Sequence, residues 1–188
     1  MKKILLASQS PRRRELLSKL GYEFDVISLY CDESFPKEME ASKVAGYISR
    51  KKADFYSNLR DHEILITADT VVSVENEILG KPEDYQEALA MLKKLSGKTH
   101  EVYTGVTFKT ISGCTTLSDR AEVTFLDISE EEIEYSLQHS KTFDKAGSYG
   151  IQDWIGMAKI SRICGSYYTI MGLPTHIVYE ELKKLMRA

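Results

Sequence analysis

The stretch ILITADTVVSV, residues 64–74, is a long run of β-branched and apolar side chains. Such a run predicts a buried strand. Asp69 does not fit the pattern, because a carboxylate is costly to bury unless it is paired or coordinated. Either it caps a nearby turn, or it binds a divalent cation or activates a water molecule. We favour a functional role, since bulges and strand ends are common places for catalytic groups.

Helices and strands alternate on both sides of this run, and the middle of the chain is rich in strands. The expected strands cover residues 4–7, 22–28, 64–74, 77–80, 101–110, 115–125 and 156–166. The expected helices cover residues 11–20, 42–59, 84–97, 129–140 and 175–186. Hairpins, such as the one around Ser112 and Gly113, interrupt the alternation, so an α/β fold with a mixed sheet and flanking helices is predicted. No linker separates independent domains, and residues 1–188 are expected to form a single domain.

Composition excludes several classes of protein. The 188 residues carry 25 basic and 28 acidic side chains, a net charge of −3, which argues against a nucleic-acid-binding module. No apolar run approaches the roughly 18 residues of a membrane span, and the first one is too short for a signal peptide. The chain has an odd number of cysteines, Cys31, Cys114 and Cys164, and their wide spacing matches neither a disulfide framework nor a zinc site. A cytoplasmic protein is therefore expected.

The segment QSPRRREL, residues 9–16, places three arginines where a helix begins. Ser10 can cap that helix and Pro11 suits its first position. Cations are disfavoured at this end of a helix by roughly 0.3–1 kcal/mol each, whereas an anion is stabilised there. The cluster is therefore either a seat for phosphate or a solvated basic face in which Arg12 pairs with Glu15.

Lysines provide further candidate phosphate ligands. In the helix at 42–59, the inward stripe contains Val44, Ile48, Phe55 and Leu59, which places Lys51 or Lys52 at its edge. Such a lysine can also pack its stem and extend its ammonium into water. Lys81 and Lys145 lie in loops, where a lysine is usually just solvated, although the glycines after Lys145 would let a ligand approach the backbone.

Several cations, one buried carboxylate and a helix N-terminus are what a polyphosphate with a bound metal requires. The chain contains neither a Walker A nor a GxGxxG sequence, so a P-loop or dinucleotide-binding fold is not expected. It contains neither GxSxG nor HExxH, the signatures of common hydrolases.

The motifs LLASQSPRRRELL, ADTVV, EILGKP, DKAGSYGIQ and GSYYTIMGLP resemble, in order and over nearly the whole chain, those of the Maf family. Members of that family are nucleoside triphosphate pyrophosphatases. The resemblance implies an elongated α/β fold like that of inosine triphosphate pyrophosphatases, with a cleft between two lobes. It also implies a divalent cation, Mg²⁺ or Mn²⁺, a nucleoside triphosphate substrate, and, because many members are dimers, a homodimer.

Carried onto this sequence, the resemblance makes Asp69 the acceptor of a proton from the attacking water. Asp69 and Glu33 would hold the metal. The triphosphate would be bound by Ser8, Arg12, Arg13, Lys52, Lys81 and Lys145. Arg14 matches no family role, and a solvated side chain is expected for it.

Three residues, Arg12, Thr70 and Gln152, match the specificity positions of the dTTP/UTP pyrophosphatase branch. A glutamine amide offers one donor and one acceptor, which complement the O4 and N3–H edge of uracil or thymine. Two alternatives remain: a pyrophosphatase for 7-methyl-GTP, and a regulator of cell division that binds nucleotides without hydrolysing them.

Overall fold

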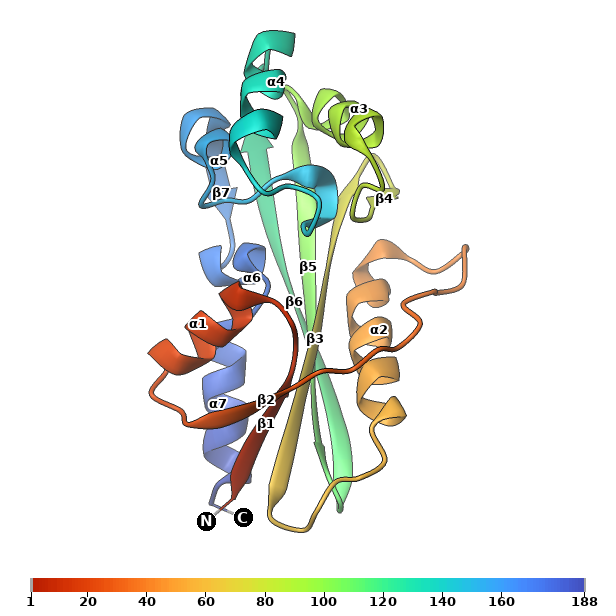
Figure 1. The fold of residues 1–188 in the computed structure, drawn as a ribbon, viewed down its shortest axis with the longest axis vertical. Helices are drawn as coiled ribbons and strands as arrows, with labels where there is room; N and C mark the ends of the chain where they lie inside the picture. Colours follow the sequence, from red (N-terminus) through yellow and green to blue (C-terminus); the bar gives the residue numbers. More distant parts are fainter. Residues whose placement is uncertain (1, 188) are drawn as a thin grey trace. The chain divides into compact units, whose positions relative to one another are not determined.

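The computed structural model describes residues 2–187. Its strands, in chain order, are β1 Lys3–Ala7, β2 Phe24–Ile27, β3 Glu63–Val74, β4 Glu77–Leu79, β5 Thr99–Thr110, β6 Gly113–Phe125 and β7 Ile160–Cys164. Its helices are α1 Pro11–Lys19, α2 Ala41–Phe55, α3 Tyr85–Leu95, α4 Glu130–His139, the short 3-10 turn η1 Ala146–Ser148, α5 Trp154–Lys159, α6 Tyr167–Met171 and α7 Thr175–Leu185 (Figure 1).

The strands of the described part of the chain form one seven-stranded mixed sheet in the order β2-β1-β3-β5-β6-β7, with β4 paired to β3. Strand β1 runs parallel to both β2 and β3, whereas β4 and β7 run antiparallel to β3 and β6. A two-residue turn joins β5 to β6, one residue earlier than predicted. The predicted α/β class with a mixed sheet and flanking helices is confirmed.

The chain divides into two compact units. Unit 1 consists of Met1–Asp69, Thr104–Asp119 and Gly172–Ala188, and unit 2 of Thr70–Tyr103 and Arg120–Met171. The long strands β3, β5 and β6 contribute residues to both units. The expected cleft between two lobes stays a prediction.

Strand β3 is buried at every position from 63 to 74 except Thr70, as its apolar, β-branched sequence requires. Asp69 is buried in the interior of this strand, as its position within the predicted strand at 64–74 implies. The hairpin that follows turns at Glu75 and Asn76, whose φ values of 51° and 65° match the left-handed pair of a tight hairpin.

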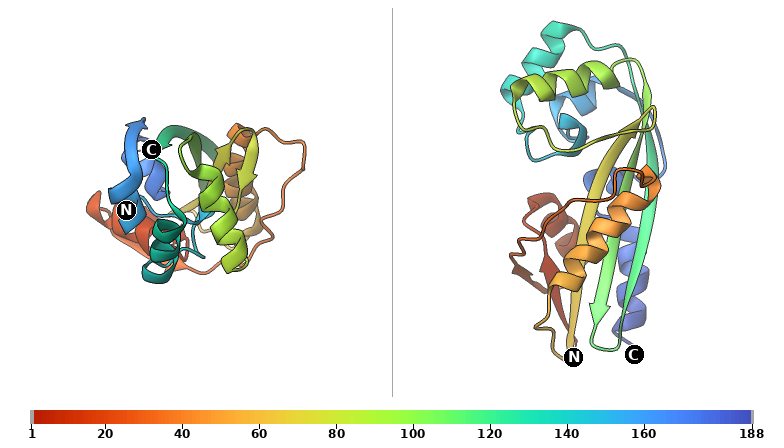
Figure 2. Two further views of the ribbon diagram at one scale, coloured as in Figure 1. Left: turned by 90° about the horizontal axis from the view of Figure 1, so that it is seen from above. Right: turned by 90° about the vertical axis from the view of Figure 1, so that its right-hand side faces the viewer.

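Within unit 1, α2 lies along one face of the strands and α7 along the other (Figures 1 and 2). Helix α2 ends at Phe55, four residues earlier than predicted. The inward assignment of Phe55 was wrong, because 61% of this side chain is exposed and Ala53 is buried instead. Leu59 follows the helix but still packs against the cluster of Leu5, Ala7, Ala53 and Leu65.

The serines at the N-caps of α1 and α4 behave differently, because one of the two side chains makes a capping hydrogen bond. Ser129 and Glu132 form the predicted capping box, with Glu132 N donating to Ser129 Oγ at 3.3 Å. Ser10 is the N-cap of α1 but makes no side-chain cap bond, so the capping prediction for Ser10 was wrong. Its backbone N–H instead donates to Ser8 Oγ at 3.2 Å. Gly21, at φ 85°, follows the end of α1 as predicted.

The predicted strand at 156–166 was wrong in its first part. Residues 154–159 form α5, and the strand β7 starts only at Ile160. A helix of six residues is too short to show a helical period, and the alternation in AKISRIC favoured a strand. Gly156 packs where an added Cβ would meet the carbonyl oxygen of Ile151 at 2.3 Å, which explains the glycine inside this short helix.

Unit 2 packs α3, α4 and α5 around one apolar core. The loop at 144–152 is fixed to this core by Tyr149, whose hydroxyl lies 2.7 Å from Nε2 of the buried His100. Burial lowers the pKa of His100 to about 4 and raises that of Tyr149, so both rings are neutral at pH 7. The loop that carries Lys145 and Gln152 is therefore held by a neutral, buried contact.

Candidate active site

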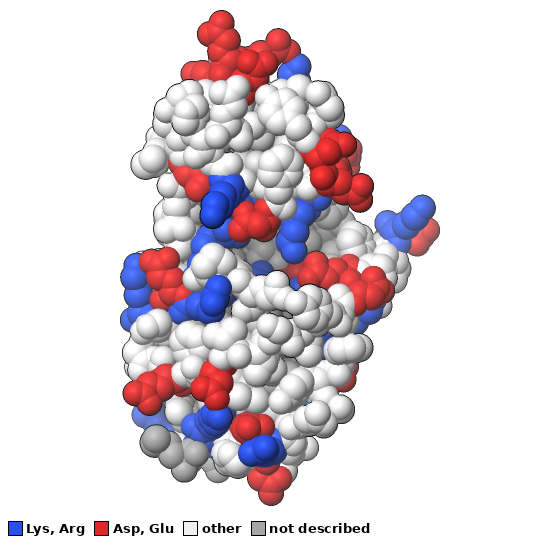
Figure 3. Space-filling view, in the orientation of Figure 1, with Lys and Arg blue, Asp and Glu red and all other residues white. Residues whose placement is uncertain are grey.

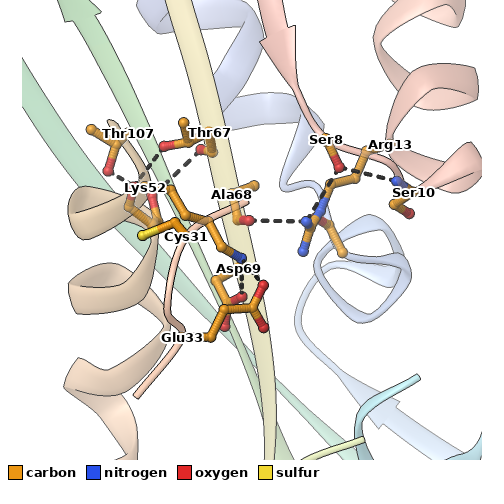
Figure 4. A network of polar contacts seen from close by, with 12 residues as sticks. Ser8, Ser10, Arg13, Cys31, Glu33, Lys52, Thr67, Ala68, Asp69 and Thr107 are labelled. Atoms are coloured by element: carbon orange, nitrogen blue, oxygen red, sulfur yellow. Dashed lines mark hydrogen bonds and ion pairs between the residues drawn. The ribbon is translucent and has the colours of Figure 1, made fainter. Parts of the chain in front are cut away.

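The carboxylate of Asp69 is the centre of the polar network in unit 1 (Figure 4). Lys52, in the last turn of α2, places its Nζ 2.7 Å from Asp69 Oδ1 and 2.8 Å from Glu33 Oε1. The exposed fractions of the side chains are 10% for Asp69, 13% for Lys52 and 45% for Glu33. Because the Lys52–Asp69 pair is largely shielded from water, loss of either partner would leave the other charge poorly compensated.

The two neighbouring lysines of α2 have different partners. Lys51 binds Asp32 at 2.7 Å and also donates to Ser34 O at 3.0 Å, at the exposed surface of the loop. The bonds from Lys51 and Ser34 hold the pKa of Asp32 well below its usual range. The structure therefore brings Lys52, and not Lys51, to Asp69.

Arg13 of α1 approaches the same point of β3 from the other side in Figure 4. Its Nε donates to the carbonyl of Gly172 at 2.7 Å, and its Nη1 donates to that of Ala68 at 2.9 Å and lies 3.5 Å from Ser8 Oγ. Burial lowers the pKa of Arg13, and the nearby Asp69 charge opposes that shift. Arg13 thus fixes the backbone immediately before Asp69 while it places a second cation near the carboxylate.

The other arginines of this helix are placed differently. Arg12 is half-buried, whereas Arg14 is exposed and donates to Gln9 O at 3.3 Å. Glu15 pairs with Lys19 at 2.6 Å. On the face shown in Figure 3, basic and acidic side chains are interspersed, in keeping with 25 basic and 28 acidic residues.

Sequence reasoning missed the hydroxyl network beneath the Lys52–Asp69 pair. Thr67 Oγ1 donates to the carbonyl of Ser49 at 2.7 Å, and Ser49 Oγ lies 2.6 Å from Thr107 Oγ1. All three residues are fully buried. Ser49 precedes Lys52 by three residues on α2, and Thr67 precedes Asp69 by two on β3, so each shares a face with its charged neighbour.

Replacing Thr67 by Val should lower the free energy of unfolding by about 1–2 kcal/mol, because the isosteric side chain loses one buried hydrogen bond. Urea unfolding measures the change. Thr67→Ser keeps the hydroxyl and serves as the control. A Val variant that is as stable as the wild type would contradict a role for this hydrogen bond in fixing α2 on β3.

In unit 2, Lys81 and Lys145, which were predicted to bind phosphate, lie on loops joined by a backbone hydrogen bond. The N–H of Gly147 donates to the carbonyl of Gly80 at 3.0 Å, which joins the loop of Lys145 to the residue before the exposed Lys81. The φ of 69° at Gly147 is one that glycine adopts without strain.

The ammonium of Lys145 is itself largely buried and paired. It lies 3.1 Å from Asp144 and 3.3 Å from Asp153, and it donates to the carbonyl of Lys141. Asp153 was not predicted as a partner, and its sequence position after Gln152 gave no signal. Gln152 is exposed and Thr70, the first residue of unit 2, is half-buried.

Two carboxylates are available for a metal in unit 1. No group of three or more His, Cys, Asp or Glu side chains suited to a metal occurs between residues 2 and 187. Asp69 and Glu33 nevertheless converge on one cation, the Lys52 ammonium. This donor set fits Mg²⁺ or Mn²⁺ that takes its other ligands from phosphate and water, and not a cage built only from protein.

In the part of the chain that the structure describes, no helix is both long and apolar enough to cross a bilayer.

Among solved structures, the chain is similar to a HAM1 protein from Coxiella burnetii, with a TM-score of 0.46 and 14% identity, over 100% of this chain and 99% of the other.

Sequence comparison gives much closer relatives. A protein of Flavobacterium psychrophilum named dTTP/UTP pyrophosphatase is 48% identical over 178 residues, 94% of this chain and 91% of its own length. Proteins of the same name from Phocaeicola vulgatus and Bacteroides thetaiotaomicron are 48% and 47% identical, over 97% of this chain and 96% and 95% of their own lengths. The family described as Maf-like protein matches residues 3–185, and the chain therefore belongs to the Maf family.

Proposed function

We propose that this protein hydrolyses dTTP and UTP to the nucleoside monophosphate and pyrophosphate. Relatives named dTTP/UTP pyrophosphatase are similar to this protein over nearly their whole length. The structural observation that supports hydrolysis is the buried Asp69 carboxylate, which lies 2.7 Å from the Lys52 ammonium and interacts electrostatically with the half-buried Arg13 guanidinium. A carboxylate so placed can accept a proton while nearby cations stabilise negative charge on phosphate.

Asp69 is the proposed proton acceptor for the water that attacks the α-phosphorus. Ser8, Arg12, Arg13 and Lys52 are the proposed phosphate ligands of unit 1. Their positive charge would stabilise the pyrophosphate leaving group, as in other phosphoryl transfer reactions. Lys81 and Lys145 are the proposed phosphate ligands of unit 2.

Asp69 and Glu33 are the proposed ligands of a divalent cation, Mg²⁺ or Mn²⁺. When bound with the nucleotide, such a cation offsets phosphate charge and polarises the phosphoryl oxygens. The protein's own contribution is a pair of carboxylates held by the Lys52 ammonium in one place.

We assign the enzyme to the cytoplasm, a proposal supported by three free cysteines, Cys31, Cys114 and Cys164, which suit a reducing compartment. A homodimer is proposed from the family resemblance and is tested by sedimentation equilibrium.

Pyrophosphate release from a panel of nucleoside triphosphates tests the proposed function. Metal-dependent turnover of dTTP and UTP, with little turnover of ATP or 7-methyl-GTP, is the expected result. Turnover of 7-methyl-GTP alone would contradict the assigned base. Nucleotide binding without any turnover would favour the regulator.

Gln152 is proposed to read the pyrimidine edge together with Arg12 and Thr70. Gln152→Glu should lower kcat/KM for UTP by tenfold or more, because a carboxylate cannot donate to O4 and leaves polar groups unpaired. Steady-state kinetics with UTP and 7-methyl-GTP measure the change. Gln138→Glu, on the exposed surface of α4, is the matched charge control. An equal effect of both variants would refute the role of Gln152.

A further inference from the structure

The Lys52 ammonium makes short contacts with both carboxylates that are proposed to hold the metal. Its Nζ lies 2.7 Å from Asp69 Oδ1 and 2.8 Å from Glu33 Oε1. Distances in this range are those of charge-assisted hydrogen bonds. Only 13% of the Lys52 side chain is exposed, so the pair with Asp69 is largely shielded from water.

Two positive charges therefore face two negative charges in this network. The second is the Arg13 guanidinium; burial lowers its pKa, and the negative charges of Asp69 and Glu33 partly oppose that shift. These two cations and two carboxylates sum to about zero, and the nearby Arg12, whose positive charge also lowers the pKa of Arg13, adds to the positive side. A free divalent cation would have to add charge to a cluster without net negative charge and displace an ammonium from its two hydrogen bonds.

A metal bound to a nucleoside triphosphate changes the sum of charges at this cluster. The triphosphate brings several negative charges with the metal, and these give the displaced ammonium and the guanidinium new partners. The same lysine would then oppose the free metal and favour the metal–nucleotide complex.

We propose that Lys52 competes with free divalent cations for Asp69 and Glu33, so that the metal enters only together with the nucleotide. This inference rests on the proposed function, because it takes these two carboxylates as the metal ligands. It assigns Lys52 a second role beside phosphate binding, namely that of the resident cation of the nucleotide-free protein.

Binding of free Mn²⁺ to the nucleotide-free protein, followed by electron paramagnetic resonance, tests the proposal. Lys52→Met removes the ammonium and keeps much of the stem, and it should bind Mn²⁺ at least tenfold more tightly than the wild type. Lys51→Met removes the neighbouring exposed lysine and should behave as the wild type does. Lys52→Arg keeps a cation and should also bind Mn²⁺ weakly.

Two further variants tie the gain in Mn²⁺ affinity to the Lys52 ammonium and its carboxylates. Adding Asp69→Asn to Lys52→Met should abolish the gain, since one of the two carboxylates is then neutral. If Lys52→Met does not fold, as judged by circular dichroism, Lys52→Gln replaces it with the same expected gain. Equal Mn²⁺ affinity of the wild type and the folded Lys52 variant, or an equal gain in Lys51→Met, would overturn the proposal.

The Mn²⁺ titration needs no turnover, so the two proposals can fail separately. Tight Mn²⁺ binding by Lys52→Met, in a protein whose wild type does not hydrolyse dTTP or UTP, would support the competition and refute the function. Normal hydrolysis by the wild type with no gain in Lys52→Met would support the function and refute the competition.

Discussion

Asp69→Asn is expected to lower kcat for dTTP and UTP by about a thousandfold and to change nucleotide binding by only a few-fold. The amide keeps the shape of the side chain but cannot accept the proton of the attacking water, and general-base catalysis contributes roughly 10²–10⁴. Lys52 keeps Glu33 as a charged partner, so its ammonium retains one ion pair in the variant. Steady-state kinetics give kcat, and calorimetry gives the affinity for the nucleotide.

Asp32→Asn is the matched control, because Asp32 lies one residue before Glu33 and its charge pairs with Lys51 at the surface. It should keep nearly full activity. Activity of Asp69→Asn within tenfold of the wild type would rule out Asp69 as the base. Loss of nucleotide binding in step with kcat would point to a binding role instead.

Gly105→Ala should have the largest effect on stability. An added Cβ at this position would meet three backbone atoms of α2, namely the N and Cα of Gly46 at 2.4 and 2.5 Å and the carbonyl C of Ala45 at 2.5 Å. Backbone atoms cannot rotate away, so the helix must move from the strand. We expect a loss of about 3 kcal/mol, at the upper end for overpacked cores.

A thermal scan by circular dichroism measures this loss, which should appear as a drop in Tm of roughly 10 °C for a chain of this size. Gly113→Ala, at the start of β6, is the control, because nothing lies within 4 Å of its added Cβ. A Tm for Gly105→Ala within 2 °C of the control would contradict the close packing of α2 on β5.

Sequence patterns were sufficient for the elements with strong periodicity. The β-branched run at 64–74 became β3, and the helices α3 and α7 follow their apolar spacing. The patterns did not predict whether a capping hydrogen bond forms or where a very short helix lies. Ser10 occupies an N-cap position without capping, and the six residues of α5 are too few to show a period.

The candidate site was predicted in part. The unusual Asp69 was identified from its apolar sequence surroundings alone, whereas the choice between Lys51 and Lys52 needed the family resemblance. The two lysines differ by one helical step of about 100°, and only the packing of α2 on β3 shows which one reaches the carboxylate. The Ser49–Thr67 contact joins residues 18 apart in sequence, so no local pattern could have revealed it.

The most direct test of the account is hydrolysis of UTP in ¹⁸O-labelled water, followed by ³¹P nuclear magnetic resonance. Attack of water on the α-phosphorus predicts unlabelled pyrophosphate and one ¹⁸O atom in the phosphate of the monophosphate. Label in the pyrophosphate, or release of inorganic phosphate and a nucleoside diphosphate, would contradict the account.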